Sequence, residues 1–205
     1  MRADIDRVVL ASANAGKIRE IAEIFSGLDI TIVAQTDFDI ESPEEIGATF
    51  VENALIKARF AVARSGLPAM ADDSGIVVDA LNGRPGVRSA RFAGSNASDE
   101  QNLDKLLEEM AEIADDVRGG GFHCAAVLVF PEETTEPIIV EAVWRGTILR
   151  ERKGDGGFGY DPVFLDPVTG KTGAEMRRAE KNAVSHRGKA FRELESRLRE
   201  HIENG

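Results

Sequence analysis

The feature that most constrains the fold of this chain is a pair of adjacent aspartates, Asp72 and Asp73, after an apolar run. The run covers residues 67–70, and Ser74 and Gly75 follow the two acids. An apolar run that gives way to acids and a glycine predicts a buried strand that ends in a tight turn. Because neighbouring side chains on a strand point to opposite faces, we expect the two aspartates to differ in role. One would face a cleft, and the other would anchor the turn.

Hydrophobic periodicity predicts the other elements. Short apolar runs predict strands, and apolar residues three or four positions apart predict amphipathic helices. The expected strands cover residues 8–11, 30–34, 76–78, 122–130, 138–144 and 163–165. The expected helices cover residues 18–25, 49–64, 98–110 and 175–181, with a last helix from residue 189 onward. We expect the two longest strands to form a hairpin with an acidic tip at residues 131–137, and residues 115–121 to be a glycine-rich connector.

Length and composition limit the class of protein. The chain has 205 residues and no linker long enough to divide it, so we expect a single domain over residues 1–205, with at most two closely joined lobes. Its net charge of −11 argues against general binding to nucleic acid or to an anionic membrane, because those partners require a basic face. The single cysteine, Cys124, is expected in the core. There is no apolar signal region and no bilayer-length segment, so we expect a cytoplasmic location.

Two polar loops are candidates for binding an anion or a metal ion. The loop at residues 12–17 lies between a predicted strand and a predicted helix, which is the arrangement that aims helix N-terminal amides at an anion. Lys17 would add a point charge for phosphate. On the loop alone, a tight turn with a solvent-exposed lysine is favoured, because the loop is neither a Walker loop nor a dinucleotide fingerprint. Glu44 and Glu45 lie in a second loop, for which a solvated acidic surface is the simpler interpretation.

A third unusual segment, residues 154–162, contains four glycines and two aromatic residues. Glycines allow close approach of the backbone to a ligand. Phe158 and Tyr160 supply flat faces and Asp161 supplies an acceptor, so the segment suits a flat polar ring. The alternative is a hairpin connection whose aromatic side chains fill the core. His186, near the start of the last predicted helix, is by itself more typical of a capping or packing residue.

Taken together, these residues indicate a particular chemistry. The acids Glu44, Glu45, Asp72 and Asp73 are hard oxygen ligands suited to Mg²⁺, with Mn²⁺ as a substitute. The cations Lys17, Lys57, Lys181 and Arg187 suit a polyphosphate, and the aromatic-glycine segment suits a base. Carboxylates, lysines and a divalent metal imply phosphoryl chemistry by positioning and charge neutralisation. The residues alone therefore indicate a metal-dependent nucleotide hydrolase.

Six motifs make the sequence resemble the inosine triphosphate pyrophosphatase family. They occur in the family's order and cover residues 7–200, although each motif alone would be weak evidence for the family. The motifs are Ser12-x-Asn14-x-x-Lys17-x-x-Glu20; Glu44-Glu45-x-Gly47-x-Thr49-Phe50-x-Glu52-Asn53-Ala54-x-x-Lys57-Ala58; Ala71-Asp72-Asp73-Ser74-Gly75; Leu81-Asn82-Gly83-x-Pro85-Gly86-Val87-x-Ser89-Ala90-Arg91; Gly156-Gly157-Phe158-Gly159-Tyr160-Asp161-Pro162-x-Phe164; and Glu180-Lys181-Asn182-x-x-Ser185-His186-Arg187.

The resemblance implies a fold and a reaction. The fold is α/β, with a long mixed central sheet, flanking helices and two lobes around a nucleotide-binding cleft. The reaction cleaves ITP, dITP or XTP between the α- and β-phosphates, which yields the monophosphate and pyrophosphate. A homodimer is also implied.

The resemblance also implies roles for individual residues. Asp73 is the expected general base and a metal ligand, Glu45 shares the metal, and Asp72 orients the turn. Phe158 is expected to stack on the purine while His186 and Arg187 reach its edge. The implied substrate-binding set is Ser12, Ala13, Asn14, Ala15, Gly16, Lys17, Lys57, Ser74, Phe158, Gly159, Tyr160, Asp161, Lys181, His186 and Arg187.

Hydrogen bonding gives a reason for the implied substrate preference. Hypoxanthine and xanthine carry an acceptor at position 6, where adenine carries a donor. The guanidinium of Arg187 can only donate, so facing adenine it would be left unpaired.

Two alternatives stay open at this point. The nearer is a Maf-like pyrophosphatase acting on modified pyrimidine or methylated nucleotides, against which the motifs at residues 158–161 and 185–187 argue. The other is a nucleotide-sensing protein without turnover. A sensor has no need of four acids beside a polyphosphate, because those acids repel it unless a metal intervenes.

Overall fold

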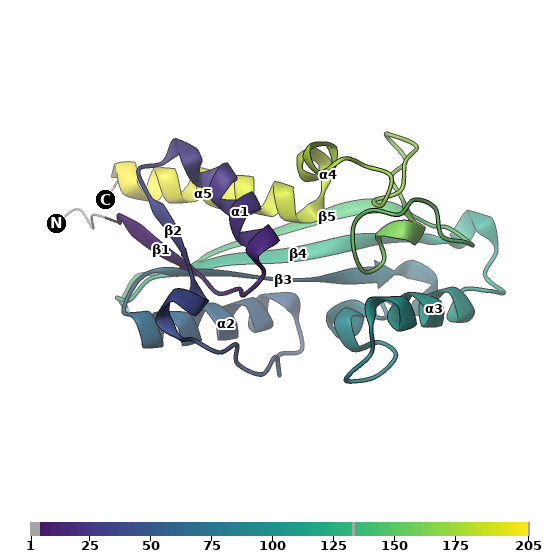
Figure 1. The fold of residues 1–205 in the computed structure, drawn as a ribbon, viewed down its shortest axis with the longest axis horizontal. Coiled ribbons are helices and arrows are strands. Elements are labelled where there is room, and N and C mark those ends of the chain that lie inside the picture. The colour runs from purple at the N-terminus through teal and green to yellow at the C-terminus, as the bar shows by residue number, and fades with distance from the viewer. Residues whose placement is uncertain (1–4, 133, 205) are drawn as a thin grey trace. The chain divides into compact units, whose positions relative to one another are not determined.

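The structure is a computed structural model that describes residues 5–132 and 134–204. A six-stranded sheet has the strand order β2-β1-β3-β4-β5-β6 (Figure 1). The strands are β1 (Arg7–Leu10), β2 (Thr31–Ala34), β3 (Ala69–Val78), β4 (Gly119–Val129), β5 (Ile138–Ile148) and β6 (Phe164–Leu165). The α-helices are α1 (Ala15–Ile24), α2 (Phe50–Ser65), α3 (Asp99–Glu109), α4 (Arg178–Val184) and α5 (His186–Asn204). Strand β1 pairs in parallel with β2 and β3 while β5 and β6 are antiparallel, so the expected mixed α/β sheet is confirmed.

The chain forms two compact units, each built from separate segments of sequence. Unit 1 takes its described residues from Met1–Asp73, Cys124–Glu141 and Lys189–Gly205, and unit 2 takes them from Ser74–His123 and Ala142–Gly188. Strands β3, β4 and β5 each contribute residues to both units.

In unit 1, helices cover both faces of the strands. Helices α1 and α5 lie on one face and α2 lies on the other (Figure 1). Helix α2 faces the sheet with Ala54, Ala58 and Ala61, which are fully buried at one-turn spacing. Small side chains let the helix backbone pack close to the strands, where Val9 and Ala69 belong to the same apolar cluster.

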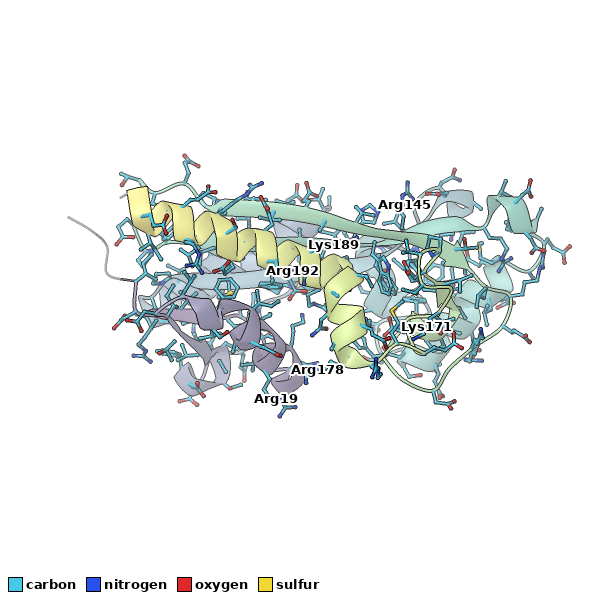
Figure 2. The ribbon with its side chains drawn as sticks, turned by 90° about the horizontal axis from the view of Figure 1, so that it is seen from above. Arg19, Arg145, Lys171, Arg178, Lys189 and Arg192 are labelled. Atoms are coloured by element: carbon cyan, nitrogen blue, oxygen red, sulfur yellow. The ribbon has the colours of Figure 1, made fainter. Side chains whose placement is uncertain are left out.

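Helix α5 is amphipathic, as its sequence predicts. Phe191, Leu194 and Leu198 are fully buried. Figure 2 shows the same helix with Lys189 and Arg192, both of which are exposed. In the part of the chain that the structure describes, no helix is both long and apolar enough to cross a bilayer.

Unit 2 has an aromatic core. The ring of Phe164 packs edge-on against Phe122 and Trp144, with centroid separations of 4.7 Å in both pairs. The indole nitrogen of Trp144 donates to Asp166 at 2.9 Å, so the buried polar atom is satisfied. The guanidinium of Arg118 is also buried, and it donates to the backbone carbonyls of Met110, Ile113, Ile148 and Leu149.

Several local predictions are wrong. The helix expected at residues 175–181 instead forms α4 at Arg178–Val184. Strand β3 continues through the stretch where we expected a turn, because its place in the sheet outweighs the local preference of Asp and Gly for turns. Its pairing with β1 covers Ala69 and Met70, ahead of the two aspartates. Residues 119–121 likewise belong to β4 rather than to a connector. Helix α5 begins at His186 instead of residue 189, because the Ser185 hydroxyl accepts from the amide of Gly188 at 3.1 Å and caps its first turn.

Candidate active site

The two adjacent aspartates of β3 point to opposite faces of unit 1. Asp72 accepts from the ammonium of Lys17 on α1 at 2.7 Å. Asp73 accepts from the side-chain amide of Asn53 on α2 at 3.0 Å. Because α1 and α2 cover different faces (Figure 1), the expectation of two separate environments is confirmed. Asp72 does not anchor a turn, since it lies inside a continuous strand.

The ammonium of Lys57 joins two of the candidate metal-binding carboxylates. It lies 2.6 Å from Glu45 and 3.7 Å from Asp73. Burial lowers the pKa of Lys57, but the carboxylates of Asp72, Asp73 and Glu45 raise it by more, so the pKa exceeds its usual value. Lys57 therefore stays charged and holds the two acids close together.

Asp73 has the electrostatics of a base. Burial raises its pKa, Lys57 and Asn53 oppose that shift, and Glu45 and Asp72 add to it, so the net pKa lies above the ordinary aspartate value. A carboxylate with a raised pKa accepts a proton more readily near neutral pH, which suits general-base catalysis.

Asn53 contacts the candidate base Asp73, although we did not assign it to the site from the sequence. Its side chain is fully buried. The amide nitrogen donates to Asp73, while the amide oxygen accepts from the backbone of Gly47 at 2.7 Å. Asn53 thus connects the base to the loop that carries Glu45. Helical periodicity predicts Asn53 outside the apolar stripe of its helix, and its burial contradicts that prediction. The available signal was its position within a motif already singled out.

The loop at residues 12–17 is shaped by its own side chains. The amide oxygen of Asn14 accepts from the backbone nitrogens of Gly16 and Lys17 at 2.9 and 3.0 Å and caps α1. Ser12 accepts from the backbone of Asn14 at 3.2 Å. The tight turn is therefore confirmed, but the solvent-exposed lysine of the simpler interpretation is wrong, because Lys17 pairs with the buried Asp72.

A pocket of about 130 Å³ lies within unit 2. Pockets that enclose drug-sized ligands measure about 300–1,000 Å³, so this one suits a single flat ring rather than a whole nucleotide. Strand β3, helix α3 and the segment around Phe158 all contribute to it. The lining residues are Ser74, Gly75, Ile76, Ser89, Ala90, Asp99, Phe122, Phe158, Gly159, Tyr160, Asp161, Lys181, His186 and Arg187.

The two aromatic residues of the glycine-rich segment differ in environment. Phe158 is 61% exposed at the pocket, where the Lys181 ammonium lies 4.6 Å and the Arg187 guanidinium carbon 5.9 Å from its ring centroid. Tyr160 is buried, and its hydroxyl donates to the carbonyl of Ser89 at 2.8 Å. Burial and the charge of Asp99 raise the pKa of Tyr160 far above its usual value. Phe158 thus fits the ring-binding interpretation, and Tyr160 fits the core-filling alternative.

The buried side chain of Asp161 holds the backbone of this segment in place. It is buried, accepts from the backbone nitrogen of Phe158 at 2.8 Å, and pairs with the ammonium of Lys181. A side chain at Gly157 or Gly173 would collide with it, since an added Cβ would lie 2.2 or 2.7 Å from its carboxylate oxygens. Glycine is therefore required at both positions.

His186 packs its ring nearly parallel to Phe122, at a centroid separation of 4.9 Å and an interplanar angle of 9°. It is buried and lines the pocket, so it is at once a packing residue and a candidate for reading a ligand edge. Arg187, the next residue, lines the same pocket.

The predicted site residues divide between the units. Unit 1 contains Ser12, Ala13, Asn14, Ala15, Gly16, Lys17, Glu45, Lys57 and Asp73, and unit 2 contains Ser74, Phe158, Gly159, Tyr160, Asp161, Lys181, His186 and Arg187. Across residues 5–132 and 134–204, the structure brings no three Asp, Glu, His or Cys side chains together as a metal-binding group. The donor set nevertheless fits Mg²⁺, because Glu45 and Asp73 already share one cation, and Mg²⁺ commonly uses one or two carboxylates plus water and phosphate oxygens.

Comparisons with known proteins show the family to which the chain belongs. The profile of the Ham1 family matches residues 8–197. The dITP/XTP pyrophosphatases of Salmonella paratyphi A and Escherichia coli K12 are each 50% identical over 195 residues, which cover 95% of this chain and 99% of those proteins. The solved structure of a HAM1 protein from Coxiella burnetii is 46% identical, with a TM-score of 0.90 over 96% of this chain and all of that chain. The resemblance inferred from the six motifs is confirmed: the chain belongs to the Ham1 family.

Proposed function

We propose that this protein hydrolyses the noncanonical purine nucleotides ITP, dITP and XTP to the monophosphate and pyrophosphate, and so removes them from the nucleotide pool. The observation that carries the proposal is Asp73, a buried carboxylate with a raised pKa, held between Asn53 and the Lys57–Glu45 pair. Relatives of about 50% identity bear the name dITP/XTP pyrophosphatase, which supports the same reaction here.

The acids and cations of unit 1 would act on the phosphates. Asp73 would accept a proton from the attacking water, and Glu45 and Asp73 would hold Mg²⁺, or Mn²⁺ in its place. When bound, the metal ion would neutralise phosphate charge and acidify water. Lys17 and Lys57 supply further positive charge. The amide oxygen of Asn14 caps α1, and its amide nitrogen would contact an oxygen of the ligand.

The pocket of unit 2 would hold the base. Phe158 stacks on the purine, and His186 and Arg187 read its edge. Ser74 and Lys181 contact the ribose or phosphates. Because Arg187 only donates hydrogen bonds, it favours the 6-carbonyl of hypoxanthine and xanthine over the 6-amino group of adenine.

We further propose that the two units fold as a single domain, and that the protein works in the cytoplasm as a homodimer that binds neither nucleic acid nor membrane. The net charge of −11 supports the last point, because nucleic acid and anionic lipid repel an acidic protein.

The deciding experiment compares pyrophosphate and orthophosphate release from ITP, XTP, dITP, GTP and ATP, with and without Mg²⁺. We expect pyrophosphate from ITP, XTP and dITP, and only with metal. Asp73→Asn should keep the fold and lose at least roughly a hundredfold in kcat, because it removes the proton acceptor. Asp104→Asn, at an exposed ion pair on α3, is the matched control and should retain activity.

Three outcomes would contradict the proposal. Activity confined to pyrimidine or methylated nucleotides would favour a Maf-like enzyme. Tight nucleotide binding without turnover would favour a sensor. Near-wild-type turnover by Asp73→Asn would remove Asp73 from the role of base.

A further inference from the structure

We propose that Asp99 is a positioning residue that fixes the ring of Phe158 for stacking on the base. The inference rests on the proposed function, because it assigns Phe158 to the base. Asp99 lines the pocket of unit 2 and is the first residue of α3, far in sequence from the segment that it contacts. Its carboxylate accepts from the backbone nitrogen of Gly159 at 2.9 Å.

The ring of Phe158 needs such support because the core does not hold it. The side chain is 61% exposed, so packing restrains it weakly, and its direction depends on the backbone. Gly157 and Gly159 on either side have φ of 72° and 58°. Glycine has more conformational freedom than any other residue, so this short segment is intrinsically loose.

Two carboxylates restrain the peptide groups on both sides of Phe158. Asp161 accepts from the nitrogen of Phe158 at 2.8 Å, and Asp99 accepts from the nitrogen of Gly159 at 2.9 Å. Asp161 belongs to the segment itself and is paired with Lys181 of α4. Asp99 belongs to a separate helix, so its bond ties the ring-bearing backbone to the rest of unit 2.

The helix that presents Asp99 is itself firmly placed. Ser98 and Gln101 form a capping box around it, with bonds of 3.2 and 2.8 Å between side chain and backbone. One turn into the helix, the buried Asn102 donates to the carbonyl of Ala90, another pocket residue, at 3.1 Å. Asp99 therefore holds the backbone of Gly159 from a firmly placed helix.

The contact predicts an effect on base binding alone. If the ring of Phe158 is already oriented before the ligand binds, binding does not have to supply the entropy cost of ordering the ring. Asp99→Ala should therefore weaken binding of IMP and raise the KM for ITP roughly tenfold, which corresponds to about 1.4 kcal/mol, with kcat little changed. Asp99→Asn keeps an acceptor oxygen for the amide of Gly159, so it should restore most of the affinity.

The experiment measures dissociation constants by calorimetry for IMP and for inorganic tripolyphosphate, together with kcat and KM for ITP. Asp99→Ala and Asp99→Asn are compared with Asp104→Ala, an exposed aspartate of the same helix that pairs with Arg152. We expect only Asp99→Ala to weaken the binding of IMP, and we expect no variant to change the binding of tripolyphosphate. In a Phe158→Ala background, Asp99→Ala should have no further effect on IMP, because the positioned ring is gone.

Three results would overturn the proposal. One is an Asp99→Ala variant that binds IMP as tightly as the wild type. Another is an Asp99→Ala variant that loses affinity equally for IMP and for tripolyphosphate. The third is an Asp99→Asn variant as weak as Asp99→Ala, which would make charge, rather than the hydrogen bond, responsible. Failure of the proposed function is recognised separately, because wild-type protein would then release no pyrophosphate from ITP while the IMP measurements stay interpretable.

Discussion

Among single residues, Asn53 is one of the groups that adjust the pKa of Asp73, after burial and the charges of Lys57 and Glu45. Its side-chain amide donates to the charged carboxylate and so lowers the pKa of Asp73, against the larger effect of burial. Without this donor the pKa of Asp73 should rise further. Because a general base must be deprotonated, the acid limb of the kcat/KM profile should then move to higher pH.

The corresponding variant is Asn53→Ala. We expect the acid limb to move to higher pH, since the hydrogen bond that stabilises the charged carboxylate is lost. The measurement is kcat/KM for ITP between pH 5 and pH 9. Glu52→Gln, one position earlier on α2, keeps its acceptor for the amide of Ala48 and should leave the profile unmoved. An unshifted acid limb in Asn53→Ala would show that Asn53 does not affect the pKa of the group that acts as general base.

Arg187 belongs to the same scale, as a residue expected to read the base. Arg187→Ala should reduce the preference for ITP over ATP by at least roughly tenfold, because the donor that discriminates the 6-position is lost. Arg187→Lys keeps the charge without the planar guanidinium. Its preference for ITP over ATP should lie between those of the wild type and Arg187→Ala. The readout is the ratio of kcat/KM values for ITP and ATP. An equal loss on both substrates would instead assign Arg187 to the phosphates.

At the scale of elements, α4 depends on an ionised cap. Glu180 accepts from the backbone and side chain of Arg177 at 2.9 and 3.2 Å, and from Lys171 at 3.1 Å. Figure 2 shows Lys171 in the connection that precedes α4 and Arg178 on the helix itself. The bonds from Arg177, with that from Lys171, lower the pKa of Glu180 from 4.5 to about 2.

The sign of this shift determines the pH dependence. A lowered pKa means that the contribution of Glu180 is present above its ordinary value of 4.5 and is lost as the pH falls toward about 2. We therefore expect the side-chain carboxyl of Glu180 to titrate near pH 2 by NMR, and the amide of Arg177 to report the same transition. In Glu180→Gln the amide of Arg177 should show no transition in this window. Titration of Glu180 near 4.5 would show that the cap does not form.

At the scale of the whole molecule, three strands bear on whether the units unfold together. Strands β3, β4 and β5 contribute residues to both units, so loss of unit 2 would break strands that unit 1 also uses. Leu106 is fully buried in the core of unit 2. Leu106→Ala should destabilise the protein by about 2–5 kcal/mol, through lost burial and a residual cavity.

If the chain is one domain, the loss should appear in both units at once. Fluorescence of Trp144 reports unit 2, and amide exchange in α2 reports unit 1, so the two denaturant midpoints should fall together. Val168→Ala, at a side chain that is 87% exposed, is the control and should change neither midpoint. A lower midpoint for Trp144 alone would show that the units unfold independently.

Some features of this protein depend only on near neighbours along the chain. Ser98 and Gln101, three positions apart, cap α3, and Phe191 and Leu194 lie on the buried face of α5. Alternation along a strand placed Asp72 and Asp73 on opposite faces before any partner was known. These features follow from backbone geometry and side-chain periodicity, which act over a few residues.

Other features depend on partners that are distant in sequence, and these follow only from the three-dimensional fold. The place of β3 in the sheet keeps it continuous through a stretch with turn-forming residues. Packing left Phe158 at the pocket while it buried Tyr160 two residues later. The contacts of Asn53 with Asp73, and of Asp99 with Gly159, join segments 20 and 60 residues apart. Such contacts form only when the fold brings their elements together, so no local pattern encodes them.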